Sequence, residues 1–222
     1  MITLRSQVLS NVPGVEYGFG RRGEEIPHAF EESWKAHAPV WNQVAGVDLA
    51  HIKEARQACG NVDAMWTTEK GLPIGIRAAD CVPILLALRD GSAVAAVHSG
   101  WRGTKSRIIE QVFARLGDPS KWVAVVGPAI GACCYEVSEE ISQEFAREFN
   151  WMGANQAVPK HRHLDLHAIN AAMLKRLGIG ELEVMPYCTH CSRDAEGGNG
   201  FAFESYRRDR LKARQFSVIM KR

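Results

Sequence analysis

The sequence predicts an α+β fold, because its strands come mostly as hairpins and outnumber the helices available to connect parallel strands. The clearest hairpin joins two apolar runs, residues 82–88 and 92–97, through Asp90-Gly91. An Asp-Gly pair between runs rich in Val, Ile and Leu is a strong hairpin signal. No linker, repeat or low-complexity segment interrupts the sequence, so we expect a single domain over residues 1–222.

The other strands are short apolar or alternating segments bounded by glycines or charged turns. The first of them ends on Gly18 and Gly20, and a turn at Gly71 separates the third from the fourth. We expect these strands at residues 15–20, 40–49, 63–68, 72–77, 123–126, 182–185 and 216–220.

Four segments carry apolar residues at helical spacing. They cover residues 27–37, 104–116, 138–149 and 165–178. Ser138 and Asp165 are expected N-caps, because their side-chain oxygens can accept hydrogen bonds from the free N–H groups of a first turn. Gly117 and Gly178 follow the second and fourth helices, where glycine commonly ends a helix. We expect the helices to pack outside the sheets in several layers.

The composition is that of an ordinary globular protein, with 46% hydrophobic and 23% charged residues. A net charge of +2 favours neither nucleic acid nor an acidic membrane surface as a partner. No run approaches the roughly 20 apolar residues that cross a bilayer, and the first residues lack a signal-peptide pattern. We therefore expect a cytoplasmic protein whose six cysteines are thiols or metal ligands rather than disulfides.

The ends of the central hairpin carry the residues with the most chemistry. Asp80 and Cys81 precede its first strand and His98 follows its second, and a hairpin brings its outer ends together. The chain then turns through residues 100–103 into a helix, which adds free N–H groups and Arg102. The sequence thus predicts a thiol, an imidazole and an anion site side by side. The Asp80 carboxylate either orients a ligand and moves protons or caps local N–H groups.

These segments are similar to the YfiH family, whose members are described as laccase-like polyphenol oxidases and as purine nucleoside phosphorylases with adenosine deaminase activity. The similarity runs in the same order from about residue 43 to residue 208, which is most of the chain. It rests on residues 79–83 (ADCVP), 98–103 (HSGWRG), 127–131 (GPAIG), 133–136 (CCYE), 188–189 (CT) and 205–209 (SYRRD).

The resemblance implies a four-layer α/β/β/α sandwich of mixed sheets and one metal site, usually zinc, made by one cysteine and two histidines. Two of those ligands fall on Cys81 and His98. The third belongs to a Q-V-H-G motif, where this sequence has Ala45, a side chain without a donor atom. Catalytic zinc usually keeps three protein ligands, so we expect weakened zinc binding. His51 either substitutes for the missing ligand or is an ordinary core or surface histidine, and the family description also admits copper.

The activity implied by the resemblance is that of a metal-assisted purine nucleoside enzyme. Its substrates would be phosphate and adenosine, inosine or methylthioadenosine, split to the base and ribose 1-phosphate, and it would also deaminate adenosine. We expect Cys81, His98 and Asp80 to be the catalytic residues. The phosphate would bind to four further residues: Arg102, Arg207, Gly100 and Gly103.

Three other functions remain open. The protein could be a hydrolase of a cell-wall precursor or a similar amide, with Cys81 as nucleophile and His98 as its base. It could also be a metal-depleted protein that only binds a small molecule or a partner. A laccase-like oxidase is disfavoured, because no cluster of histidines accompanies Cys81. The sequence does not determine the oligomeric state.

Further cysteines and histidines are expected to have ordinary roles. Cys188 and Cys191 have zinc-knuckle spacing, but a structural site needs four ligands and no second C-x-x-C motif exists. The adjacent pair Cys133-Cys134 either lines the pocket or has one buried and one exposed member. The histidines of the H-x-H-x-x-x-H pattern at residues 161–167 are expected to lie at the surface.

Overall fold

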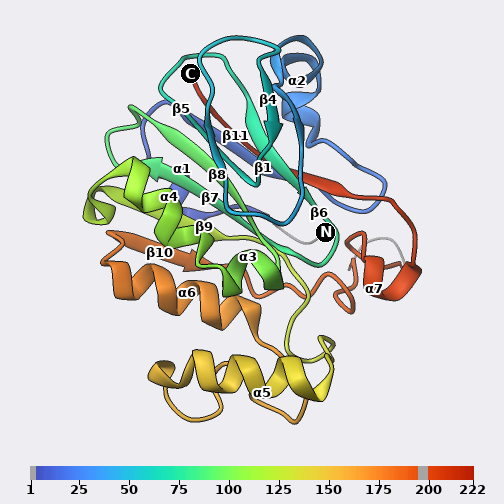
Figure 1. Ribbon diagram of the computed structural model, residues 1–222. Helices are drawn as coiled ribbons and strands as arrows, with labels where there is room; N and C mark the ends of the chain where they lie inside the picture. Colours follow the sequence, from blue (N-terminus) through green and yellow to red (C-terminus); the bar gives the residue numbers. More distant parts are fainter. Residues whose placement is uncertain (1–3, 195–199) are drawn as a thin grey trace.

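Three sheets form the strand framework of the computed structural model, which describes residues 4–194 and 200–222 (Figure 1). The largest has six strands in the order β10-β9-β7-β8-β5-β3, the second has the order β1-β11-β6, and β2 pairs with β4. The strands are β1 (Val15–Phe19), β2 (Val40–Asn42), β3 (Leu49–His51), β4 (Ala58–Asn61), β5 (Ala64–Thr67), β6 (Ile74–Ala78), β7 (Val82–Leu88), β8 (Val94–Ser99), β9 (Trp122–Val126), β10 (Glu181–Val184) and β11 (Gln215–Lys221).

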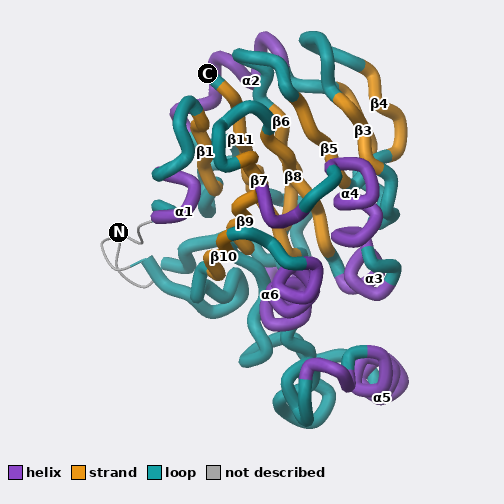
Figure 2. The backbone as a smooth tube through the Cα atoms, turned by 90° about the vertical axis from the view of Figure 1, so that its left-hand side faces the viewer, coloured by secondary structure: helices purple, strands orange, loops and turns teal. Residues whose placement is uncertain are grey.

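The predicted hairpin β7–β8 lies in the middle of the six-stranded sheet, as Figure 2 shows. Its strands are buried on both faces. Since alternate side chains of a strand point to opposite sides of the sheet, they enter two different cores. Ile84 and Leu86 belong to the core under the helices, whereas Leu85 and Ala87 belong to the core between the two larger sheets. The ends of this hairpin are therefore held by two cores at once.

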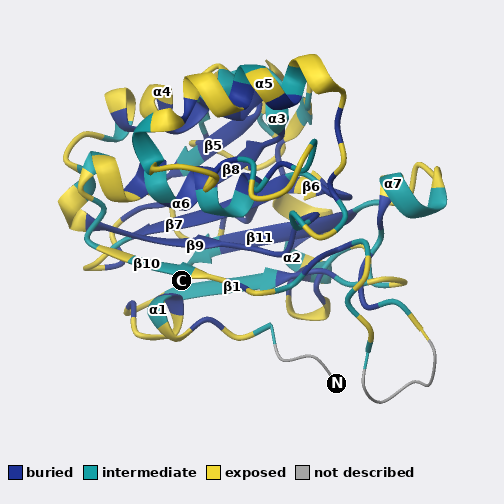
Figure 3. Cartoon of the chain, turned by 90° about the horizontal axis from the view of Figure 1, so that it is seen from below, coloured by how far each residue is buried: buried dark blue, intermediate teal, exposed yellow. Residues whose placement is uncertain are grey.

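Helices cover the outer faces of the two larger sheets, so the molecule has four layers (Figure 3). Strands β6 and β11 contact β7 and β8 between the sheets. Phe30 and Trp34 cover the three-stranded sheet at Phe216 and Val218. The predicted α+β sandwich is confirmed. The helices are α1 (Gln7–Ser10), η1 (His28–Phe30), α2 (Glu31–His37), α3 (Trp101–Lys105), α4 (Ile108–Leu116), η2 (Pro119–Lys121), α5 (Glu139–Glu148), η3 (Asn150–Met152), α6 (Leu166–Leu177) and α7 (Tyr206–Asp209).

Two predicted elements differ from the structure. The strand expected at residues 40–49 is divided into β2 and β3, because the backbone N–H groups of residues 44–46 bind the Asp63 carboxylate instead of a neighbouring strand. The helix expected at residues 104–116 begins earlier and breaks at Arg107, whose φ of 59° is left-handed. Within the part of the chain that the structure describes, no helix is both long and apolar enough to cross a membrane.

Candidate functional site

The hairpin brings Cys81 and His98 into contact, as its outer ends predicted. Pro83 pairs with His98 in the β7–β8 register, and Cys81 lies two residues before Pro83. The Cys81 thiol is within hydrogen-bonding reach of the His98 ring. Gly100 allows this approach, because a β-carbon there would lie only 3.0 Å from the Cys81 sulfur. A sulfur and an imidazole nitrogen thus meet where β8 turns into α3.

Asp63 holds the His98 ring in place from the neighbouring strand end. Its carboxylate is fully buried and lies 2.8 Å from Nδ1 of His98. The same carboxylate accepts hydrogen bonds from the N–H groups of Val44, Ala45 and Gly46, at 2.7–3.1 Å. Since Nδ1 is occupied, Nε2 is the ring nitrogen left for a ligand, a proton or the Cys81 thiol.

The charges of His98 and Asp63 stabilise each other. Burial lowers the pKa of His98, but the hydrogen bonds and charges of Asp63 and Cys81 more than offset burial and raise it to about 9. Burial raises the pKa of Asp63, yet the hydrogen bonds from His98 and the loop at residues 44–46 bring it below its ordinary value. The protonated form of the His98 ring is therefore stabilised next to the Asp63 carboxylate.

Asp80 is engaged in positioning rather than in the cavity. Its φ of 95° is left-handed, and its two oxygens accept hydrogen bonds from the Thr189 hydroxyl at 2.7 Å and the Arg207 N–H at 2.6 Å. Asp80, which directly precedes Cys81, is thereby bonded to two segments that are distant in sequence. This geometry fits the capping alternative better than the proton transfer we expected of Asp80, although the capped groups are far away in sequence.

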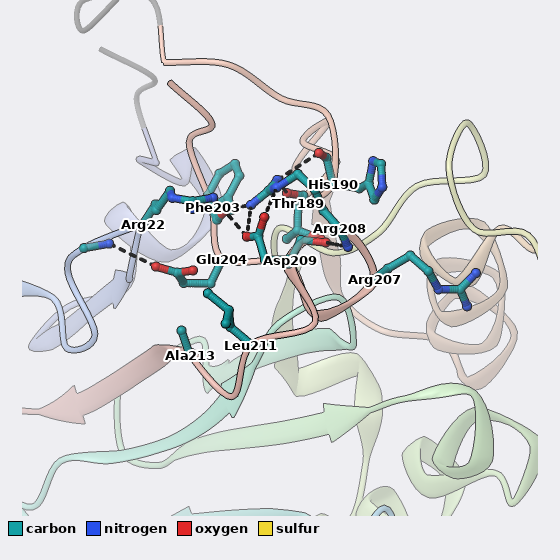
Figure 4. A network of polar contacts seen from close by, with 12 residues as sticks. Arg22, Thr189, His190, Phe203, Glu204, Arg207, Arg208, Asp209, Leu211 and Ala213 are labelled. Carbon is teal, nitrogen blue, oxygen red and sulfur yellow. Dashed lines mark hydrogen bonds and ion pairs between the residues drawn. The ribbon is translucent and has the colours of Figure 1, made fainter. Parts of the chain in front are cut away.

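The two arginines of the predicted phosphate cradle lie near Tyr135, since the charges of both act on its phenol, as Cys81 also does. Arg102 stacks on the ring of Trp101, with 4.6 Å from its Cζ to the ring centroid. Arg207 donates to the Glu136 carbonyl at 2.6 Å, and Figure 4 shows its side chain directed away from the neighbouring network. Neither arginine lines the cavity beside Cys81. Gly100 caps α3, and Gly103 faces the backbone of Gly46, so both glycines serve close packing.

A cavity of about 890 Å³ opens over Cys81 and His98. Three of its lining side chains are cationic, namely Arg77, Lys212 and Arg214, and Tyr206 adds an aromatic ring. The full lining is Gly23, Glu25, Gln43, Arg77, Ala78, Ala79, Cys81, His98, Glu204, Tyr206, Lys212, Ala213 and Arg214. Sequence reasoning missed Lys212 and Arg214, because residues 210–214 carry no motif and reach the cavity only through the fold.

A polar network holds the segment that supplies Tyr206, Lys212 and Arg214 over the cavity (Figure 4). The Arg208 guanidinium donates to the carbonyls of Thr189, His190 and Phe203 at 2.8–3.0 Å. It also pairs with Asp209, which binds Arg22 from the N-terminal part of the chain. Backbone acceptors thus fix Arg208, and the Arg214 guanidinium in turn donates to the carbonyls of Leu211 and Ala213 at 3.1 and 2.7 Å.

Tyr135 is a second residue that the sequence did not mark as functional. It is buried, and burial together with the nearby Cys81 raises its pKa, so its phenol is neutral. The Arg207 guanidinium lies over its ring at 5.3 Å from the centroid. The sequence signal for it is the segment 133–136 (CCYE), one of the segments on which the family resemblance rests.

The donor atoms fit a catalytic zinc ion only in part. Cys81 and His98 supply one sulfur and one nitrogen, and Ala45 supplies none. His51 does not take its place, because it lies on β3, which β5 separates from the strand of His98. Its ring stacks on Trp66, with 3.8 Å between the ring centroids. Among residues 4–194 and 200–222, three or more possible metal ligands come close together at another place, formed by Cys133, Cys134, Cys188 and Cys191. A three-ligand zinc site is thus not complete at Cys81 and His98.

The fold and this pocket define a four-layer sandwich protein with a thiol-imidazole pair at the end of a central hairpin. Residues 26–222 match the family described as multi-copper polyphenol oxidoreductase laccase, and the chain belongs to this family. The resemblance to YfiH proteins is confirmed. The Neisseria meningitidis protein NMB0706 has a similar structure, with a TM-score of 0.72 and 29% identity over 83% of this chain and 75% of that one. A Bacillus licheniformis hypothetical protein YfiH has a TM-score of 0.69 and 27% identity, over 83% of this chain and 74% of that one.

Relatives at the sequence level carry the names of purine nucleoside enzymes. A purine nucleoside phosphorylase of Clostridium acetobutylicum is 33% identical over 72% of this chain and 67% of its own length. The purine nucleoside phosphorylase YfiH of Escherichia coli is 30% identical over 82% of this chain and 73% of its own length. An adenosine deaminase from an unknown prokaryotic organism is 36% identical over 64% of this chain and 56% of its own length.

Proposed function

We propose that the protein is a purine nucleoside phosphorylase whose site is the cavity over Cys81 and His98. The observation that carries this proposal is that the Cys81–His98 pair and three cationic side chains line one cavity. Phosphate requires cationic or N–H donors, and a purine base requires an apolar or aromatic surface. The names of the relatives from Clostridium acetobutylicum and Escherichia coli support the same substrate class.

The chemistry follows from the protonation of His98. A phosphate oxygen attacks C1′ of the ribose as the bond from C1′ to the base nitrogen breaks, and the departing base takes up a proton. With a pKa raised to about 9, the His98 imidazolium is protonated at neutral pH and can supply that proton. Asp63 keeps the ring oriented and stabilises its charge. The products are the free base and ribose 1-phosphate.

The cations of the cavity serve the other half of the reaction. The side chains of Arg77, Lys212 and Arg214 attract phosphate into the cavity and offset its charge near C1′. The Gln43 side chain holds the backbone of Arg77 by two hydrogen bonds, of 2.7 and 3.1 Å. Tyr206 is half exposed at the cavity and presents a ring on which a purine can stack. The Arg214 guanidinium lies 5.4 Å from the centroid of that ring, so phosphate and base would bind next to each other.

Adenosine deamination is the second candidate, because one relative is named an adenosine deaminase. Deamination needs an activated water, for which zinc deaminases use a bound metal ion. With Ala45 in place of a third ligand, the residues of this chain favour phosphorolysis over deamination. Copper oxidation is disfavoured, since His98 is the one histidine among the described residues that line the cavity.

The test is to identify products from adenosine and inosine by mass spectrometry, with and without phosphate. We expect the free base and ribose 1-phosphate, and only when phosphate is present. Inosine formed from adenosine without phosphate would instead support deamination. Absence of any product under all conditions would reject the proposal and leave the hydrolase and the metal-depleted binding protein. Hydrolysis of a cell-wall precursor, abolished by Cys81→Ser, would identify the hydrolase.

A further inference from the structure

Four cysteines gather at a second place, apart from the Cys81–His98 pair. The sulfurs of Cys133, Cys134, Cys188 and Cys191 all lie within 4.8 Å of one another, and none of them is in a disulfide. Two come from the turn that follows the 127–131 loop, and two come from the turn after Tyr187. We propose that these four cysteines bind a zinc ion, which makes a second metal site with a structural role.

The spacing of the sulfurs fits a tetrahedral ion. Bonds of about 2.3 Å from zinc to four sulfurs place the sulfurs about 3.8 Å from one another. The sulfurs of Cys133 and Cys191 are 3.7 Å apart. The other sulfur pairs lie within 4.8 Å, so changes of at most about 1 Å in these separations complete the tetrahedron. The group is compact enough for a single ion rather than a cluster of several.

The backbone around Cys188 is arranged as at a thiolate ligand. The Gly131 N–H donates to the Cys188 sulfur at 3.2 Å, and the N–H groups of His190 and Cys191 also bond to it. Gly131 permits this approach, since a β-carbon there would lie 3.3 Å from the Cys133 sulfur and 3.7 Å from the Cys188 sulfur. Such N–H groups stabilise negative charge on sulfur, which a zinc ligand carries.

The ligand chemistry selects the ion and its role. Thiolates prefer zinc, copper(I) or iron–sulfur clusters over hard cations such as magnesium. Four protein ligands close the coordination sphere, as in structural zinc sites, and leave no position for a reacting water. Cys188 is buried, whereas Cys133 and Cys191 are exposed, so an ion can enter from solvent. We therefore assign the site to stability and positioning.

The two segments that carry the four cysteines both contact Asp80. The Thr189 hydroxyl, between the two knuckle cysteines, donates to Asp80 at 2.7 Å, and the Ile130 N–H donates to the Asp80 carbonyl at 2.9 Å. Tyr135 follows Cys134 directly and lies near Cys81. Zinc at the four cysteines would fix these turns to each other and thereby hold the residue that precedes Cys81.

Zinc content of matched variants tests the site without using activity. We expect the purified full chain to retain about one zinc per molecule through gel filtration in the presence of a weak chelator. Cys191→Ser and Cys134→Ser should lose that zinc, whereas Cys81→Ser and the control Cys59→Ser should keep it. Zinc lost from Cys81→Ser but kept by Cys191→Ser would overturn the proposal. Copper or iron in its place would also overturn it.

A second measurement uses the unaltered protein, in case a serine variant fails to fold. After zinc removal by a strong chelator, alkylation with iodoacetamide followed by peptide mapping should label Cys133 and Cys191 quickly. Added zinc should slow labelling of both at least tenfold, and labelling of Cys59 should not change. Added cobalt(II) should give the intense sulfur-to-metal absorption of a four-thiolate site. Labelling rates that do not respond to zinc would contradict the site.

Discussion

The Asp63 carboxylate connects His98 to the loop that contains Ala45. It lies 2.8 Å from the His98 ring and 2.9 Å from the Ala45 N–H, so a single buried anion fixes both positions. One side chain thus positions both the His98 imidazole and the backbone of residue 45. This contact explains why the loop stays beside the pocket although residue 45 has no donor atom.

Replacing Asp63 with Asn should impair both stability and activity. Removal of the buried carboxylate leaves the His98 imidazolium without its counter-ion and weakens three backbone hydrogen bonds. We expect a loss of about 2–4 kcal/mol in the free energy of unfolding, measured by urea denaturation. We also expect kcat for phosphorolysis to fall more than tenfold with a smaller change in KM. The control Asp48→Asn alters an exposed side chain of the same segment, and equal losses in both variants would contradict this role of Asp63.

The sequence predicted the central hairpin and the meeting of Cys81 and His98, because local turn chemistry and strand pairing determine both. It could not predict the cavity cations. Lys212 and Arg214 reach the site through a segment held by Arg208, whose acceptors are carbonyls of residues 189, 190 and 203. Such backbone contacts leave no pattern in the side-chain sequence.

The four cysteines show a second limit of sequence reasoning. The spacing of Cys188 and Cys191 suggested a zinc knuckle, but the search for a second C-x-x-C motif failed. The fold instead supplies the adjacent pair Cys133-Cys134, because Ala129 and Cys188 form a β-bridge that brings the two turns together. Contacts between turns 57 residues apart follow from packing, which spacing rules do not describe.

Ala45→His should strengthen zinc binding at the Cys81–His98 pair. The loop backbone is already held by Asp63, and the φ of 59° at residue 45 lies in a region that histidine tolerates better than most side chains. We expect a second equivalent of zinc to be retained and its affinity to rise at least tenfold, as measured by competition with a chelating dye. Val44→His is the matched control, because Val44 is exposed in the same loop. An unchanged zinc content in Ala45→His would place residue 45 outside the metal site.

Arg214→Ala and Arg102→Ala should separate the observed cavity from the predicted cradle. Arg214 lines the cavity, whereas Arg102 stacks on Trp101 outside it. Loss of a charged contact to phosphate costs about 1.5–3 kcal/mol. We therefore expect KM for phosphate to rise about tenfold or more in Arg214→Ala and to stay within twofold in Arg102→Ala. Initial rates at varied phosphate provide the measurement, and the reverse order would restore the cradle expected from the sequence.

His167 should make the protein less stable at mildly acidic pH. Burial lowers its pKa below the ordinary value of 6.5, with partial opposition from its hydrogen bond to the Gly127 carbonyl and from Asp165. As pH falls below 6.5, the unfolded chain binds a proton before the folded protein does. The free energy of unfolding should therefore decrease, by at most about 1.4 kcal/mol per pH unit for this proton.

His167→Gln removes the titrating group and keeps an amide that can donate to the Gly127 carbonyl. Urea unfolding is measured at about pH 7.5, 6.5 and 5.5, in steps of about one unit around the ordinary histidine pKa. This variant should therefore lose less stability over that range than the unaltered protein. His37→Gln changes an exposed histidine and should leave the slope unchanged. If His167→Gln and the unaltered protein lose stability in parallel, the acid sensitivity arises from another group, and the partly buried imidazole of α6 is not its source.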